Sequence, residues 1–194
     1  MIPMKTKIPQ VKVWDRFVRL FHWLLVAAVL TAYFSEGEPR WLHTTAGYTV
    51  ATLVLLRIVW GFIGPRHARF ADFVYPPRAV FAYLAALVRR APLRYLGHNP
   101  AGGAMVVVIL LMLLATTTMG LMLYAVHDGG GPFSLFIQKG PEAFAHSLEE
   151  IHEILANITI TLAVIHVAGV LVNSWLHREN LIKSMLTGYK RSGN

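Results

Sequence analysis

Four of the nine histidines in this 194-residue sequence fall in long apolar segments, where an imidazole is costly unless its ring nitrogens find partners. Two of them, His152 and His166, are 14 residues apart, and the stretch from Ile154 to His177 carries no formal charge. In a helix this spacing is close to four turns, so the two rings share one face at levels roughly 21 Å apart. The spacing suits two ligand sites stacked along one helix.

The other two histidines match these levels in depth, measured from the tryptophans near the ends of the apolar segments. His22 lies eight residues after Trp14, and His43 lies two residues after Trp41. Tryptophan is enriched at membrane–water interfaces, so it marks where each segment enters the bilayer. We therefore predict two facing pairs, one at each level: His43 with His152, and His22 with His166.

Two imidazoles at one level fit haem better than zinc. A zinc site needs three or four ligands that converge on one point, and each level offers two histidines. Haem iron takes two axial ligands, because the porphyrin supplies the other four. Small residues near the ligands (Gly47, Ala168 and Gly169) would let a flat macrocycle approach the backbone. The alternative, a histidine hydrogen-bonded to a neighbouring carbonyl, stays open at this point.

Arg57 follows His43 by 14 residues, so it lies on the same face of its helix, one level deeper. A buried arginine needs an anionic partner. A haem propionate, a quinone or a lipid headgroup would serve, and the alternative is an arginine that snorkels to the membrane surface.

The elements that must hold these residues are four membrane-spanning helices. The sequence is 55% hydrophobic and 14% charged, which is too apolar for an ordinary soluble domain. Four apolar segments, at about 14–35, 41–63, 101–125 and 150–176, are long enough to cross a bilayer, and they are continuously apolar, unlike barrel strands. We predict an all-α four-helix bundle in one domain, residues 1–194. A basic amphipathic connection joins the second and third helices, and its middle is expected to lie on the cytoplasmic leaflet.

The net charge of +8 reflects topology and does not indicate nucleic-acid binding. Lysines and arginines concentrate in the N-terminal segment, the middle connection and the C-terminal tail, which four spans place on one side. The positive-inside rule then predicts both termini in the cytoplasm. We expect no cleavable signal peptide. The sequence has no cysteine, which excludes disulfides, covalent c-type haem attachment and iron–sulfur clusters on this chain.

Four stretches carry a family resemblance: "VWDRFVRLFHW", "LLRIVWGFIGPRHARFADFV", "YLGHNPAGGAM" and "EEIHEILANITITLAVIHVAGVLVNSWLHRENLIKSMLTGYKR". In order, they extend over nearly the whole chain, from Val13 to Arg191. They resemble the bacterial cytochrome b561 family, in particular the branch with the cytochrome b subunits of nickel–iron hydrogenases. The resemblance implies a four-helix membrane bundle with b-type haem and bis-histidine ligation. Its ligands fall on the residues already selected by depth: His22, His43, His152 and His166.

The predicted function is a dihaem b-type cytochrome of the bacterial inner membrane, an electron-transfer protein or a subunit of an oxidoreductase. It would relay electrons between an outer-face redox partner, such as a cytochrome c or a hydrogenase-like protein, and the quinone pool or another acceptor. One alternative is the membrane-anchor cytochrome b subunit of a multisubunit oxidoreductase such as a nickel–iron hydrogenase. Another, from a different class, is a haem-free four-span transporter or assembly factor. Membrane lipid is an expected partner in each case.

Overall fold

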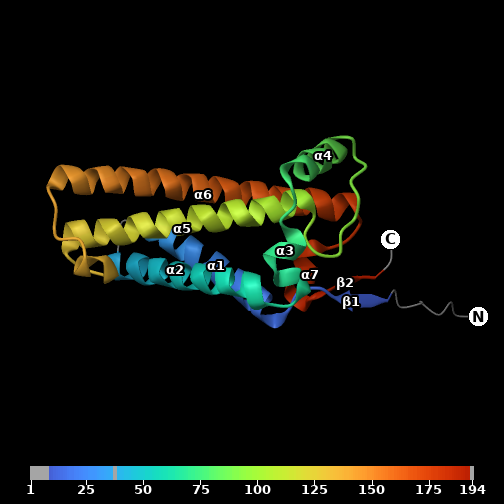
Figure 1. The fold of residues 1–194 in the computed structure, drawn as a ribbon, viewed down its shortest axis with the longest axis horizontal. Coiled ribbons are helices and arrows are strands. Elements are labelled where there is room, and N and C mark those ends of the chain that lie inside the picture. Colours follow the sequence, from blue (N-terminus) through green and yellow to red (C-terminus); the bar gives the residue numbers. More distant parts are fainter. Residues whose placement is uncertain (1–8, 37–38, 193–194) are drawn as a thin grey trace, which may run out of the picture. The chain divides into compact units, whose positions relative to one another are not determined.

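Four long helices dominate the computed structural model, which describes residues 9–36 and 39–192. They are α1 (Arg16–Phe34), α2 (Arg40–Ile63), α5 (Pro100–Asp128) and α6 (Glu142–Leu176), shown in Figure 1. All four are long and apolar enough to cross a membrane. The predicted all-α membrane fold with four spans is confirmed.

Shorter elements fill the connections and the two ends of the chain. Between α2 and α5 lie η1 (Arg66–Ala68), α3 (Phe70–Phe73) and α4 (Pro77–Val88). A short η2 (Pro132–Leu135) lies between α5 and α6, and α7 (Leu181–Thr187) follows α6. Two three-residue strands, β1 (Gln10–Lys12) and β2 (Tyr189–Arg191), pair antiparallel, with Val11 opposite Lys190. Neither strand was predicted, because three residues are too few to show an alternating pattern.

Two of the helices are longer than the apolar pattern indicated. Helix α6 begins at Glu142, eight residues before the predicted start, and α5 continues to Asp128. His127 and His146, which lie outside the predicted spans, are therefore in helical turns. The reason is that the residues at the start of α6 include good helix formers, alanine and glutamate. A helix can extend into water beyond either end of its apolar segment.

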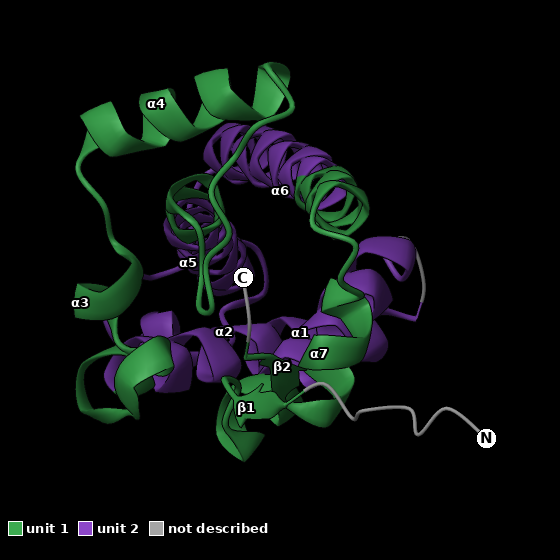
Figure 2. Cartoon of the chain, turned by 90° about the vertical axis from the view of Figure 1, so that its right-hand side faces the viewer, with its two compact units in different colours: residues 1–20, 60–105, 166–194 green, residues 21–59, 106–165 purple. Residues whose placement is uncertain are grey.

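The chain divides into two compact units, and each of the four spans contributes to both. Unit 1 comprises residues 1–20, 60–105 and 166–194, and unit 2 comprises residues 21–59 and 106–165. In Figure 2 each span changes colour along its length, where it passes from one unit to the other. The two units are described separately below.

Unit 1 joins the start of the chain to its end. The backbone N–H groups of Val13 and Trp14 both donate to the carbonyl of Gly188, at 2.9 and 3.1 Å, directly after the β1–β2 pair. The Trp14 indole donates to the Ser184 hydroxyl at 3.4 Å. Val13 and Trp14 are buried with Val18 and Ala68 in one hydrophobic cluster. The start of α1 is thereby fixed to α7 and β2.

A buried cluster of charges lies beside these strands in unit 1. Arg94 binds the Glu179 carboxylate at 3.0 Å, and Glu179 also accepts from the backbone N–H of Arg191 at 3.0 Å. Burial acts to raise the pKa of Glu179, but the hydrogen bonds from Arg94 and Arg191 outweigh it and the pKa is lowered. Lys190, 6% exposed, donates to the carbonyls of Tyr95 and Gly97. Burial lowers the pKa of Lys190 to about 8.

In unit 2, polar contacts tie the four helices together. The Tyr33 hydroxyl of α1 donates to Asn157 of α6 at 2.9 Å, and Arg40 of α2 forms an ion pair with Asp128 of α5 at 2.9 Å. Hydroxyl groups of Thr116 and Thr159 meet at 3.3 Å between α5 and α6. Apolar packing of Val126 against Ala145 and Leu148 adds a second contact between these two helices.

Candidate functional site

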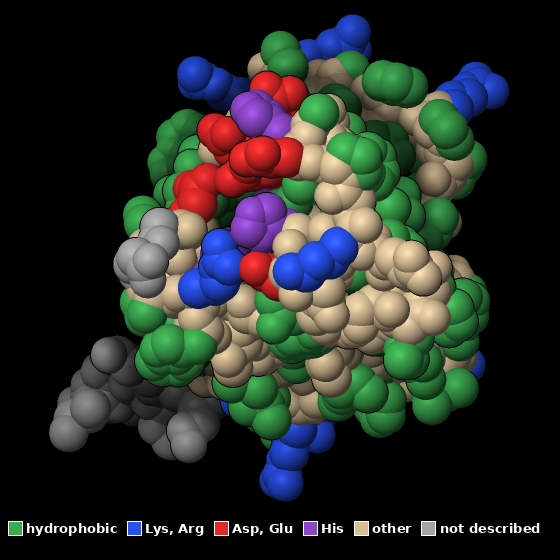
Figure 3. All heavy atoms as spheres, turned by 90° about the vertical axis from the view of Figure 1, so that its left-hand side faces the viewer, with side chains coloured by type: hydrophobic (Ala, Val, Ile, Leu, Met, Phe, Trp, Pro, Cys, Tyr) green, Lys and Arg blue, Asp and Glu red, His purple; other side chains and the backbone are tan. Residues whose placement is uncertain are grey.

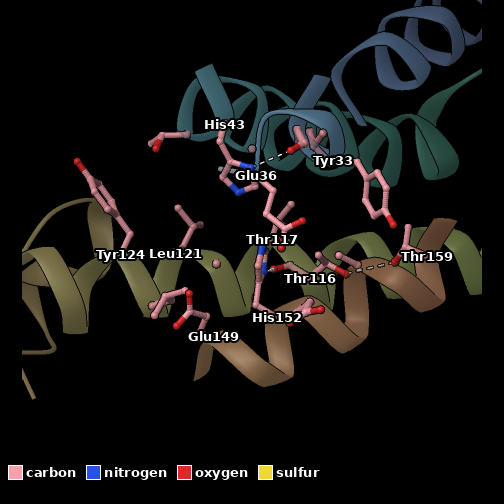
Figure 4. A pocket seen from close by; sticks show the side chains of 18 of the residues that line it. Tyr33, Glu36, His43, Thr116, Thr117, Leu121, Tyr124, Glu149, His152 and Thr159 are labelled. Carbon is pink, nitrogen blue, oxygen red and sulfur yellow. Dashed lines mark hydrogen bonds between the residues drawn. The ribbon is translucent and has the colours of Figure 1, made fainter. Parts of the chain in front are cut away.

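The rings of His43 and His152 face each other inside unit 2. Their centroids are 6.0 Å apart, and the ring planes are inclined by 80°. His43 comes from α2 and His152 from α6, and Figure 4 shows the two side chains pointing toward one another across a cavity. The fold therefore brings together His43 and His152, the two residues that the sequence predicts to form a pair.

A backbone carbonyl orients each of the two rings. His43 Nδ1 lies 2.8 Å from the Ala32 carbonyl, and His152 Nδ1 lies 3.0 Å from the Thr116 carbonyl. A carbonyl can only accept, so both Nδ1 atoms carry the proton and donate it. The Nε2 atom of each ring is then left with a lone pair. Metal-binding histidines commonly have this arrangement, in which the outer N–H bond fixes the tautomer and the ring orientation.

The ring separation fits one metal ion held between two imidazoles. Two metal–nitrogen bonds of about 2 Å each, plus about 1 Å from each nitrogen to its ring centre, put the centroids roughly 6 Å apart. The observed separation is 6.0 Å. No cluster of three or more histidine and carboxylate side chains that could hold a metal occurs in residues 9–36 and 39–192. The pair therefore suits a metal that brings its other ligands with it, as haem iron does.

The cavity around the pair has a volume of about 580 Å³. This is within the range of pockets that enclose small molecules and cofactors. Its lining combines apolar side chains from all four helices with hydroxyl groups and small residues, among them Thr116, Thr117, Gly120 and Ala156. The cavity and its two oriented imidazoles fit a b-type haem.

Gly120 allows the close approach of α5 to the His152 ring. A Cβ atom at this position would lie 2.9 Å from His152 Cε1 and 3.2 Å from Nδ1, which is closer than carbon atoms normally come. The ring thus rests against the backbone of α5, one turn after the carbonyl of Thr116 to which it is bonded. A larger residue would displace the ring from its position opposite His43.

The rim of the cavity is acidic. Its lining includes the carboxylates of Glu36, Glu149, Glu150 and Glu153. Figure 3 shows acidic side chains gathered beside histidines on this face of the molecule. Arg40, which also lines the cavity, is paired with the Asp128 carboxylate. Negative charge therefore surrounds the opening, at the end of unit 2 formed by the α1–α2 turn and the α5–α6 loop.

The other predicted site residues are divided between the units. His22 belongs to unit 2, is half-buried and packs edge-on against Trp23 at 5.1 Å. Arg57, also in unit 2, is 3% exposed. His166 is half-buried and belongs to unit 1. The pairing of His22 with His166 and the role of Arg57 stay predictions.

Most of the remaining histidines have ordinary partners. His67 contacts the Asp72 carboxylate at 2.9 Å, and His127 contacts Asp128 at 3.1 Å. His98 packs between the rings of Trp14 and Phe73, each 4.7 Å away. These three histidines are therefore held by neighbouring side chains, as structural histidines are.

Comparison with known proteins identifies the family. A sequence profile of the prokaryotic cytochrome b561 family matches residues 13–188. The chain belongs to this family. As a cytochrome b561-type protein it functions in membrane electron transfer, and membership implies b-type haem as the cofactor. The family prediction made from the sequence is confirmed.

Several relatives of this cytochrome b561-type chain carry the same name, probable Ni/Fe-hydrogenase B-type cytochrome subunit. The protein from Rhodobacter capsulatus is 26% identical, over 93% of this chain and 81% of its own length. That from Azotobacter chroococcum is 28% identical, over 93% of this chain and 88% of its own length. The corresponding hydrogenase 1 subunit of Escherichia coli K12 is 26% identical, over 64% of each chain.

The supporting residues of the site were missed by sequence reasoning. The carbonyls of Ala32 and Thr116 orient the ligand rings, but a backbone group leaves no mark in a sequence. Gly120 and the threonines before it did leave a signal, because they interrupt an otherwise apolar segment. In a membrane helix, small and hydroxyl-bearing residues mark close approach and polar contact.

Proposed function

We propose that this cytochrome b561-type chain binds two b-type haems and relays electrons through the membrane between a redox partner at the acidic rim and an acceptor such as the quinone pool. The observation that carries the proposal is the facing pair of His43 and His152, 6.0 Å apart, with each Nδ1 bonded to a carbonyl. When bound, haem supplies reversible one-electron chemistry at its iron.

At the first site, His43 and His152 would bind the haem iron. The carbonyls of Ala32 and Thr116 hold both imidazoles in the tautomer that presents Nε2. An N–H bond to a carbonyl also makes the other nitrogen a better electron donor. The residues of this chain thereby bind the iron and orient its ligands.

At the second site, we assign His22 and His166 as ligands and Arg57 as the partner of an anionic group. The support is their position along the helices, because His166 follows His152 by 14 residues and Arg57 follows His43 by 14. Arg57 is buried in a membrane-spanning helix, where an arginine needs negative charge nearby. A haem propionate would supply that charge.

We further propose that both chain ends and the connection between α2 and α5 face the cytoplasm. The positive-inside rule supports this orientation, since lysine and arginine concentrate in those segments. The acidic rim around the His43–His152 cavity would then face outward. A donor outside the membrane would deliver electrons to the first site, and the second site would pass them to the cytoplasmic side.

The names of the relatives favour a narrower version of this function. Relatives covering more than nine-tenths of this chain are named as B-type cytochrome subunits of Ni/Fe-hydrogenases. On this basis we propose that the chain is the membrane cytochrome subunit of a multisubunit oxidoreductase, with a hydrogenase as its electron donor. Membership of a cytochrome family removes the support for a haem-free transporter or assembly factor.

A haem count combined with ligand variants tests the proposal. Purified protein should contain two non-covalent b-type haems per chain in a pyridine haemochrome assay. His43→Ala and His152→Ala should share one spectral and redox defect, and His22→Ala and His166→Ala should share another. One haem in fully loaded protein would refute the two-site proposal. Grouping of His22→Ala with His152→Ala in well-folded protein would refute the pairing.

A further inference from the structure

Arginines occupy two backbone positions where glycine is normally found. Among the residues that the structure describes, the non-glycine residues with positive φ are Arg90 (φ 58°) and Arg178 (φ 49°). Left-handed backbone is unfavourable for residues with a Cβ atom. Such strained residues are often found at functional sites, so an observed outlier is a reason to look for a function.

Both arginines lie just after the end of a helix, in the same type of cap. After α4, the N–H of Ala91 bonds to the Ala86 carbonyl and that of Arg90 bonds to Leu87. After α6, the N–H of Glu179 bonds to the Ser174 carbonyl and that of Arg178 bonds to Trp175. These bonds define Schellman caps, in which the left-handed residue is usually glycine. The fold would therefore accept glycine at both positions.

Trp175, at the end of α6, contacts Arg90 through its ring and Arg178 through its backbone. The Arg90 guanidinium lies 5.9 Å from the centre of the Trp175 ring, within the range of a cation–π contact. Arg178 is bonded through its backbone to the same residue, at 3.2 Å. Trp175 is 67% exposed and both arginines are exposed. An exposed tryptophan at the end of a membrane-spanning helix is typical of the membrane–water interface.

Helix α4 is fixed to the end of α6 at this same level. The hydroxyl of Tyr83, a buried residue of α4, donates to the Asn173 side chain of α6 at 2.7 Å. The opposite face of α4 is exposed and apolar: Phe81 is 70% exposed, Leu84 is 41% exposed and Val88 is 85% exposed. Arg78 and Arg89, near the two ends of α4, are exposed as well. An apolar face between basic residues is typical of a helix at a membrane surface.

We propose that Arg90, Arg178 and Trp175 form a binding site for the headgroup of an anionic phospholipid, whose acyl chains lie against the exposed face of α4. Guanidinium groups bind phosphate by paired, charge-assisted hydrogen bonds. The tryptophan positions the Arg90 guanidinium at headgroup depth. The apolar face at Phe81, Leu84 and Val88 favours a lipid over a free phosphate ion.

The competing explanation is that each arginine only stabilises its own helix. A positive side chain near a helix C-terminus interacts favourably with the helix dipole. Arg90→Gly and Arg178→Gly separate the two roles, because glycine retains the cap, relieves the left-handed strain and removes the charge. A helix-stabilising role predicts less stable variants. A lipid site predicts variants that are at least as stable without anionic lipid and that no longer respond to it.

The test compares purified full-length protein in detergent with added phosphatidylcholine, phosphatidylglycerol or inorganic phosphate. Native mass spectrometry gives lipid affinity, and tryptophan fluorescence gives the unfolding temperature. In the wild type, phosphatidylglycerol should bind and raise the unfolding temperature, and the other two should not. The Arg90→Gly/Arg178→Gly double variant should bind phosphatidylglycerol roughly thirtyfold more weakly. The control, Lys12→Gln/Lys183→Gln, removes the same charge from two exposed positions of unit 1 and should bind like the wild type.

Two results on affinity would overturn the proposal: unchanged phosphatidylglycerol affinity in the double glycine variant, or an equal loss of affinity in the control. Two results on stability would also overturn it. These are stabilisation of the wild type by phosphate alone, and a lower unfolding temperature of the glycine variant in phosphatidylcholine. The haem count provides an independent readout. It should be the same in all three proteins, so failure of the lipid site is distinguishable from failure of the haem proposal.

Discussion

Gly120→Ala should weaken haem binding at the His43–His152 site while leaving the haem-free fold as stable or more stable. The added methyl would lie 2.9 Å from His152 Cε1. In the haem-free protein, the His152 ring can swing away, and alanine improves the helix by about 1 kcal/mol. With haem bound, the ring is held both by the iron and by the Thr116 carbonyl, so it cannot move freely. Overpacking at such a position costs about 1–3 kcal/mol, which is roughly a 5- to 150-fold loss of haem affinity.

Haem titration of the haem-free protein, followed in the Soret band, measures this affinity, and thermal unfolding without haem measures the fold. Gly169→Ala is the control for this site, because it adds a methyl with nothing within 4 Å to a helix of the other unit, beside the proposed ligand His166 of the second site. The control should leave binding at the His43–His152 site unchanged. Wild-type haem affinity at this site in Gly120→Ala would refute the argument that α5 sets the position of the His152 ring.

Three further predictions concern the rest of the chain. Because burial lowers the pKa of Lys190 from 10.5 to about 8, folding disfavours its charged form at neutral pH. Stability should therefore rise by about 3 kcal/mol as the pH increases from about 8 to about 10.5, and Lys190→Met should remove this rise in unfolding experiments. Tyr83→Phe removes the 2.7 Å donor of the buried Asn173 oxygen, which still accepts from the Asn99 amide at 3.3 Å, and should cost about 1 kcal/mol of unfolding free energy. Reporter fusions after Asn194 should behave as cytoplasmic and those within Gly129–Gly131 as periplasmic, and the opposite pattern would overturn the proposed orientation.

The four spans could be predicted from the sequence because bilayer thickness imposes a length that apolar segments must meet. The ends of the helices could not. Helix α6 begins at Glu142, eight residues before its apolar segment, because helix formation depends on backbone bonding and propensity as well as on apolar burial. The strands β1 and β2 were also missed, since they depend on pairing between residues 10–12 and 189–191. Contacts over such sequence distances leave no local pattern.

Within the candidate site, the side chains that do chemistry were easier to find than the groups that orient them. Histidine in an apolar segment is conspicuous, and depth from the nearest tryptophan selected His43 and His152 as partners. The roles of Ala32 and Thr116 depend on carbonyl direction, which only the structure gives. The role of Gly120 depends on the distance between α5 and α6, which is set by packing along both helices.

The cavity at this site also links the cofactor to the stability of the protein. Its lining includes carboxylates, hydroxyl groups and two imidazoles, so the helices cannot close over it without burying polar groups. A volume of about 580 Å³ left unfilled would also forfeit packing contacts from every helix that lines it. A ligand that binds only the folded state stabilises that state by RT ln(1 + L/Kd), where L is the free ligand concentration, so a tighter ligand stabilises it more. Loss of either His43 or His152 should therefore lower the unfolding temperature of protein purified with haem, and the two single variants should converge on one stability, that of protein that retains only the second haem. Their redox and stability defects would then share one cause, the loss of the group that fills the space between α2, α5 and α6.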